Sequence, residues 1–203
     1  MYNSRSMDFR MSHKPSKGRT PHIYADGFIY FLTARTANAE HILTTRKKKL
    51  IFVQVWNNLQ KEYHVTAYHW ILWSNHYHFL VHIPNGEHLH RLMNRLHSVT
   101  AMKMNELDGK KGRKVWQQYW DHCIRNEVDF WRHFNYITNN PIKHGWCVDL
   151  EQAAAYPYCG NRQWVEKRGS DFLFNLLCDY PVKDFEPEDE RSSMRFLLGG
   201  KDV

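Results

Sequence analysis

Residues 74–82 read SNHYHFLVH, and the turn signal Pro84-Asn85-Gly86 follows at once. The stretch is rich in aromatic and β-branched residues, so it predicts a strand that ends in a turn. Side chains two residues apart on a strand point to the same face of the sheet. His76 and His78 are therefore expected to project side by side, with Tyr77 on the opposite face. Two imidazoles on one rigid element can hold a divalent ion.

Three segments that precede this strand extend the predicted architecture. Residues 64–73 are rich in β-forming residues and join the histidine strand across a tight Ser74-Asn75 turn, which predicts a hairpin. Residues 28–34 predict an earlier strand, and residues 46–62 predict a helix between the first two strands.

Two further helices and a strand are predicted downstream. Asn85 is the expected N-cap of a helix over residues 87–107. Residues 115–125 predict a fourth strand. Asn126 then caps a helix that ends near Asn140, because Pro141 disfavours its continuation.

The order β-α-β-β-α-β-α contains the elements of a split β-α-β unit. It predicts an α+β fold, a ferredoxin-like sandwich. The antiparallel sheet carries helices on one face, and a further helix follows the last strand towards the C-terminus.

Composition favours a folded protein that binds nucleic acid. The 203 residues carry a net charge of +7, a pI near 9.2 and 15% aromatic residues. The four cysteines show no C-x-x-C spacing, which argues against a thiolate zinc site or a disulfide framework. No apolar run has the length of a membrane span, so we expect a cytoplasmic protein without membrane contact.

The predicted helix before Pro141 carries a tyrosine beside an amide. Its core stripe is Phe130, Phe134 and Ile137. Tyr136 and Asn140 are four residues apart and share a flank of the helix away from that stripe.

Two imidazoles and an amide oxygen would hold a divalent ion with coordination positions left open, as a catalytic metal requires. Zinc competes because imidazole suits it, but phosphate chemistry prefers harder ions. A tyrosine hydroxyl beside the ion is a reasonable covalent nucleophile. A phosphotyrosine link would conserve the energy of the cleaved bond.

Three motifs together resemble those of the REP-associated tyrosine transposases, which are single-tyrosine HUH transposases. The stretch at 75–81 (NHYHFLV) resembles their His-hydrophobic-His motif. The stretch at 116–127 resembles the strand that leads into their catalytic helix, and 135–145 (NYITNNPIKHG) resembles their Tyr-Ile-x-x-Asn-Pro-x-x-x-Gly signature. The resemblance covers about residues 22–165.

This resemblance implies a ferredoxin-like fold and a nuclease and strand transferase that depends on Mg²⁺ or Mn²⁺. It implies His76, His78 and Asn140 as metal ligands and Tyr136 as the nucleophile. The substrate would be single-stranded DNA beside a hairpin, and the product a 5′-phosphotyrosine. A monomer is favoured over a dimer. The alternatives are a domesticated protein that binds hairpins without cleaving them, and a relaxase-like replication endonuclease.

Composition and the extent of the resemblance divide the chain into a basic, flexible arm at 1–22, a transposase domain at 23–165 and a partly irregular, acidic extension at 166–203. The arm is either a flexible tail or a segment that tracks the DNA backbone. Further candidates for DNA contact are basic side chains, whose alternative role is a solvated surface. They are Arg91, Arg95 and Lys103 on the second predicted helix, Lys110, Lys111, Arg113 and Lys114 in the loop after it, and His133 on the flank of Tyr136.

Overall fold

The computed structural model describes residues 26–187, so the predicted basic arm at 1–22 lies outside the described residues. The strands are β1 (Phe28–Arg35), β2 (Thr66–Leu72), β3 (His76–Ile83) and β4 (Trp120–Cys123). The helices are the 3-10 turn η1 (Ala37–Ala39), α1 (Arg46–Glu62), α2 (His88–Leu107), α3 (Glu127–Lys143), α4 (Leu150–Ala155), α5 (Asn161–Arg168) and α6 (Ser170–Asp179).

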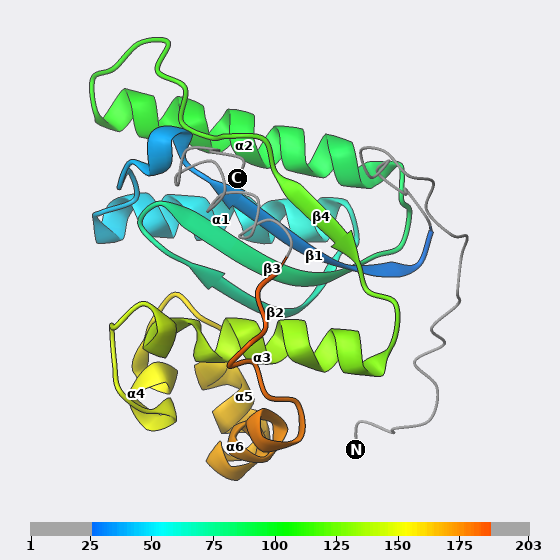
Figure 1. Ribbon diagram of the computed structural model, residues 1–203. Helices are drawn as coiled ribbons and strands as arrows, with labels where there is room; N and C mark the ends of the chain where they lie inside the picture. Colours follow the sequence, from blue (N-terminus) through cyan, green and yellow to red (C-terminus); the bar gives the residue numbers. More distant parts are fainter. Residues whose placement is uncertain (1–25, 188–203) are drawn as a thin grey trace, which may run out of the picture.

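The four strands form one sheet in the order β2-β3-β1-β4, and every neighbouring pair is antiparallel. Helices α1 and α2 cover one face of this sheet, and α3 with α4, α5 and α6 covers the other (Figure 1). This is the topology of a split β-α-β sandwich with a further helical layer, so the predicted α+β fold is confirmed.

The two faces of β3 carry different chemistry. Tyr77 and Phe79 point towards α1, where the Phe79 ring stacks on Trp56 with centroids 4.1 Å apart. His76, His78 and Leu80 alternate with them and therefore point towards α3. Burial of Tyr77 and Phe79, both 0% exposed, fixes the side of the sheet on which the histidines lie.

The fourth strand is shorter than the predicted 115–125. Val115 and Trp116 are consecutive and both buried, so this segment lacks the alternation of a paired strand. It crosses the end of β1 instead, where Trp116 forms an isolated bridge with Thr36. Regular pairing with β1 is confined to Trp120–Cys123.

Two predicted helix ends were wrong. Asn85 is not the N-cap of α2: its Oδ1 accepts from the Glu87 backbone N–H, which closes a turn before the helix begins at His88. Helix α3 does not end at Asn140 but continues through Pro141 to Lys143.

The last turn of α3 survives the missing N–H of Pro141 because three backbone bonds close it. The N–H groups of His144, Gly145 and Trp146 bond to the carbonyls of Asn140, Ile142 and Pro141. Gly145 has φ +66°, and the pattern is a Schellman motif, in which a left-handed glycine terminates a helix.

Helices α4, α5 and α6 pack onto α3 through buried amides. The Asn135 Nδ2 donates to the carbonyls of Leu176 and Tyr180, and the Asn161 Nδ2 donates to those of Thr138 and Ala153. The predicted domain boundary at 165 falls inside α5. Within residues 26–187, no helix combines the length and apolar character needed to cross a membrane.

Gly160 lies against the ring of His69, and a Cβ added there would stand 2.6 Å from His69 Nδ1. Gly160→Ala is therefore expected to lower the free energy of unfolding by about 1–3 kcal/mol, as overpacking does. Denaturant unfolding checks this value. The same substitution in a His69→Ala background should cost much less, and an equal cost in both backgrounds would contradict steric overlap with the ring.

The buried His69 side chain is also expected to make the stability of the fold sensitive to acid. Burial lowers its pKa to about 3, although a hydrogen bond with Asn161 opposes the shift. Because the folded pKa lies below the unfolded value near 6.5, stability is present above that value and is lost as the pH falls. We expect His69 to contribute a slope of about 1.4 kcal/mol per pH unit between about pH 6 and 4. Burial also lowers the pKa values of His78 and His97, which add their own contributions. Unfolding measured across this range should therefore show a slope that is smaller by about 1.4 kcal/mol per pH unit in the His69→Gln variant.

Candidate active site

The candidate metal ligands on β3 lie as the sequence predicts. The ring centroids of His76 and His78 are 5.1 Å apart, and both side chains are buried on the α3 face of the sheet. Thr33 pairs with His78 and Arg35 with His76 in the register of β1 against β3.

Hydrogen bonds select one nitrogen of each imidazole as a metal ligand. The Nδ1 of His76 bonds to Asn75 Oδ1, an acceptor, at 2.7 Å. The Nδ1 of His78 bonds to Thr33 Oγ1, whose own hydrogen points to the Tyr77 carbonyl. Both Nδ1 atoms therefore carry the hydrogen, and both Nε2 atoms present a lone pair.

Electrostatics keep the second histidine neutral. Burial, followed by the positive charges of Arg35, His144 and Lys143, lowers the pKa of His78 well below its ordinary value. A neutral imidazole is the form that binds a metal ion. The two side chains thus fit the divalent ion that the sequence predicts.

Helix α3 brings Tyr136 against this pair. The Tyr136 ring meets His78 edge-on at a centroid distance of 5.3 Å, and it meets Phe31 of β1 at 6.1 Å. The ring is 2% exposed. The strand and the helix therefore meet at the positions that the sequence could only name separately.

Lys143 lies two turns after Tyr136 on the same side of α3. Its ammonium donates a hydrogen bond of 3.2 Å to the Tyr136 hydroxyl and lies 4.8 Å from the centroid of the ring. A cation at this oxygen favours the phenolate, which is the nucleophilic form of tyrosine.

Trp73 lies between Asn140 and the histidine pair and contacts both. The Trp73 indole N–H donates to Asn140 Oδ1 at 2.5 Å, and the indole ring lies 6.3 Å from that of His76. A carbonyl oxygen has two lone pairs, so this bond leaves one lone pair of the amide for a metal ion. The structure brings Asn140 beside the site, and its role as a ligand stays a prediction.

Three cationic or titratable side chains at this site were missed by sequence reasoning: Arg35, Lys143 and His144. Arg35 enters through strand register, and His144 lies 5.0 Å from the His76 ring, measured between centroids. Together they make the surroundings of the histidines electropositive, which suits a phosphodiester.

The predicted DNA contacts on α2 and in the loop after it do not join this site. Helix α2 covers the opposite face of the sheet (Figure 1). Arg95 is paired with Glu62, and Arg113 with Asp108. Exposed members of the set are Arg91, Arg95, Lys110, Lys111 and Lys114, and Lys103 is half-buried. Contact of these residues with DNA stays a prediction.

His133 is not presented to solvent. Its ring is buried, and its Nδ1 bonds to the Asp129 backbone carbonyl at 2.8 Å. His69 and His122 are hydrogen-bonded within the protein, to Thr138 and Asp129 respectively.

Comparisons with known proteins identify the family of the chain. Residues 25–140 match the family described as Transposase IS200 like. The chain is 27% identical over 137 residues to the REP-associated tyrosine transposase of Escherichia coli (strain K12), which is 66% of this chain and 77% of that protein. A protein of the same kind from Haemophilus influenzae (strain ATCC 51907 / DSM 11121 / KW20 / Rd) is 40% identical over 45 residues, 22% of this chain and 24% of that one.

A solved structure of a REP-associated tyrosine transposase bound to a REP hairpin superposes with a TM-score of 0.59. The two sequences are 23% identical, and the superposition covers 85% of this chain and 92% of the other one. The match shows that the two proteins share a fold. These matches confirm the resemblance that the sequence motifs predict. Since the family match spans more than half of its residues, the chain belongs to the IS200-like transposases, with REP-associated tyrosine transposases among its relatives.

Proposed function

We propose that the chain is a metal-dependent, single-tyrosine transposase that cleaves and rejoins single-stranded DNA beside a hairpin. The observation that carries this proposal is the contact of Tyr136 with His78, with the Lys143 ammonium on the phenol oxygen. A tyrosine hydroxyl, a cation and a pair of imidazoles lie together in one electropositive site. The E. coli relative is a REP-associated transposase, and the structural neighbour holds a REP hairpin, so we propose hairpin DNA as the substrate here.

In the proposed reaction the Tyr136 hydroxyl oxygen attacks the scissile phosphorus. A bond forms between this oxygen and phosphorus, and the bond from phosphorus to the 3′ oxygen breaks. The phenol proton leaves to solvent and the departing 3′ oxygen takes up a proton, so protons balance. The products are a 5′-phosphotyrosine and a free 3′-hydroxyl. Attack on the phosphotyrosine by another 3′-hydroxyl reverses these steps and joins a new strand.

Residues of this chain prepare the two reacting atoms. Lys143 stabilises the negative charge on the tyrosine oxygen when its proton leaves, and again when the phosphotyrosine bond breaks in the joining step. His76 and His78, with Asn140, would hold Mg²⁺ or Mn²⁺. The ion supplies Lewis-acid stabilisation of the phosphate and the leaving oxygen. Arg35 adds positive charge beside the same histidines.

The transposase domain is proposed to begin at residue 23, with the basic arm at 1–22 tracking the DNA backbone. The packing of α5 and α6 onto α3 supports including them with the catalytic helix rather than in a separate extension. We propose that the protein acts in the cytoplasm as a monomer.

The test uses a DNA hairpin with single-stranded flanks, labelled at either end and incubated with the protein and Mn²⁺. A label at the 3′ end should become covalently attached to the protein, while a label at the 5′ end is released on a fragment with a 3′-hydroxyl. Mass spectrometry should place the adduct on Tyr136. Tight hairpin binding with no adduct in Mg²⁺ or Mn²⁺ would overturn the proposal in favour of a non-cleaving hairpin-binding protein.

Lys143→Met is expected to slow cleavage about 100-fold, because removing a donor from an oxygen that gains charge costs about that much. Single-turnover cleavage rates with saturating hairpin DNA measure this effect, and Lys143→Arg should restore part of the rate. The matched control is Lys61→Met, which removes an exposed lysine near the end of α1. If Lys143→Met cleaved at an unchanged rate but bound DNA more weakly, Lys143 would attract DNA by its charge and would have no role in the cleavage step.

A further inference from the structure

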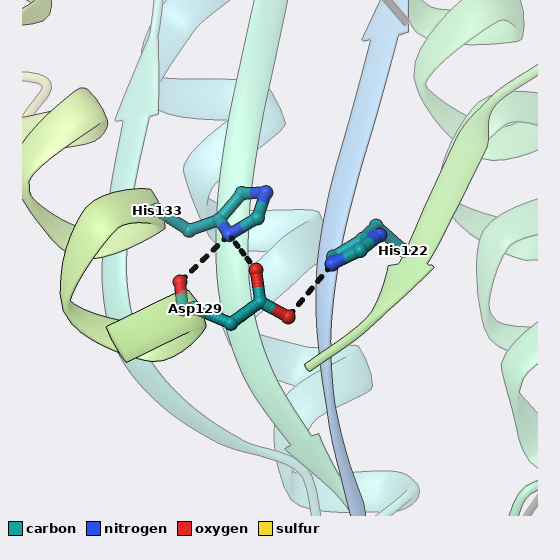
Figure 2. Close-up of side chains that lie close together, drawn as sticks. All are labelled: His122, Asp129 and His133. Carbon is teal, nitrogen blue, oxygen red and sulfur yellow. Dashed lines mark hydrogen bonds and ion pairs between the residues drawn. The ribbon is translucent and has the colours of Figure 1, made fainter. Parts of the chain in front are cut away.

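A second group of metal-binding side chains lies between β4 and α3, outside the proposed active site. His122 comes from β4, and Asp129 and His133 come from the first turns of α3 (Figure 2). One ligand atom from each lies within 4.8 Å of the other two. His122 Nε2 is 2.9 Å from Asp129 Oδ2, and His133 Nδ1 is 3.1 Å from Asp129 Oδ1.

We propose that His122, Asp129 and His133 form a second metal site, which takes Zn²⁺ or a transition ion of similar preference. Two imidazoles and one carboxylate are a set of three ligands that Zn²⁺ accepts in tetrahedral geometry, with water in the fourth position. Asp129 and His133 are four residues apart on a helix, so they share one face without distortion of the backbone. On binding, bonds to the ion would replace the hydrogen bonds of the two imidazoles to Asp129.

The charge state of the group suits this role. Burial alone would raise the pKa of Asp129, but hydrogen bonds from His122 and His133 hold it well below its ordinary range. The backbone N–H of Arg125 also donates to the carboxylate, at 2.9 Å. Asp129 is therefore an anion held in place before any ion arrives. Each imidazole frees its ligating nitrogen by moving its hydrogen to the other ring nitrogen.

Burial distinguishes this group from an ordinary surface cluster. The side chains of His122, Asp129 and His133 are 23%, 17% and 4% exposed, so an ion would be screened from bulk water yet reachable. The rings of His122 and His133 are already stacked, with centroids 4.7 Å apart.

The proposed site is distinct from the proposed catalytic one, but aromatic rings that contact both sites connect them. Phe31 lies 4.6 Å from the His133 ring on one side and 5.4 Å from the His78 ring on the other, measured between centroids. An ion here would cross-link the edge strand β4 to the helix that carries Tyr136. It would act on the position of α3, and it would touch neither the phosphate nor the tyrosine.

The experiment removes the proposed catalytic ligands first, so that it is independent of the proposed function. A full-length His76→Ala/His78→Ala protein is titrated with Zn²⁺ by calorimetry and with Co²⁺ by visible absorption. We expect one ion per chain, Co²⁺ bands of a four-coordinate site, and a higher melting temperature with Zn²⁺. No DNA is present, so loss of cleavage activity cannot imitate failure of this site.

Two variants in this background test the ligands. His122→Gln keeps a polar side chain at a partly exposed position, and Asp129→Asn keeps the shape of the carboxylate. Each should weaken Zn²⁺ binding by about 10-fold or more and abolish the Co²⁺ bands. His41→Ala, which removes an exposed histidine elsewhere, should leave both unchanged.

Circular dichroism without metal shows whether each variant folds. If a variant fails to fold, the Co²⁺ spectrum of the folded parent still decides the question. No binding by the parent, or full binding by a folded His122→Gln protein, would overturn the proposal and leave the three residues as a hydrogen-bonded clamp.

Discussion

Tyr136→Phe is expected to eliminate the covalent DNA adduct and to reduce strand cleavage by about 10⁴-fold or more, as loss of a nucleophile does. The substitution removes one oxygen and its bond to Lys143. The ring keeps its edge contacts with Phe31 and His78, so the fold and the affinity for hairpin DNA should change little. Denaturing gels resolve the adduct, and a filter-binding assay gives the affinity.

Tyr158→Phe is the matched control for this substitution. Tyr158 is a partly buried tyrosine that likewise lies beside a lysine: the Lys49 ammonium is 4.7 Å from its ring centroid. It lies away from the histidine pair. Its variant should form the adduct at the normal rate. An adduct that persists in Tyr136→Phe and maps to another tyrosine would contradict the role of Tyr136.

His78→Ala is expected to abolish metal-dependent cleavage and to weaken Mn²⁺ binding by about 100-fold or more. The bond from Nδ1 to Thr33 fixes the orientation of the ring, so that Nε2 presents its lone pair to the ion. Alanine has no atom that could replace this ligand. The side chain is 0% exposed, so a cavity penalty of about 1–3 kcal/mol in the free energy of unfolding will accompany the change. Titration of Mn²⁺ by electron paramagnetic resonance separates lost affinity from lost stability.

His82→Ala tests whether the position on β3 matters. His82 lies on the same face of the same strand, four residues further on, and pairs with Ile29 instead of Thr33. Its removal should leave Mn²⁺ affinity and cleavage intact. A folded His78→Ala protein with normal Mn²⁺ affinity would show that the ion does not bind at this pair.

The placement of His76 and His78 could be predicted because a strand repeats every two residues. The large apolar side chains Tyr77 and Phe79 must face the core, and the histidines follow from them. Helical periodicity likewise separated Tyr136 from the stripe of Phe130, Phe134 and Ile137, although Tyr136 is itself buried. In both elements the period of the secondary structure, two residues for the strand and about 3.6 for the helix, determines the face on which each side chain lies.

What escaped prediction depends on contacts between elements. Arg35 reaches the site through the register of β1 against β3, which no local pattern in the sequence determines. In the sequence Trp73 resembles any other strand residue, because the hydrogen bond from its indole N–H to Asn140 of α3 forms only in the folded chain. Phe31 of the neighbouring strand contacts both His78 and Tyr136, and this contact also arises only in the folded chain.

Lys143 was missed for a different reason. It lies seven residues after Tyr136, a spacing that returns to nearly the same side of a helix. Pro141 was expected to end the helix before this residue. The prediction weighed the lost hydrogen bond of proline but not the three bonds of the glycine-terminated end, which keep one further turn in place.

The alternation of side chains along β3 links the histidine pair to correct pairing of the strand. If β3 paired with its neighbours one residue out of register, both imidazoles would enter the aromatic core and both aromatic rings would face α3. A misfolded chain would thus lose the proposed metal ligands by the same error that exposes its core. Under the proposed function, cleavage of DNA would be confined to correctly assembled molecules.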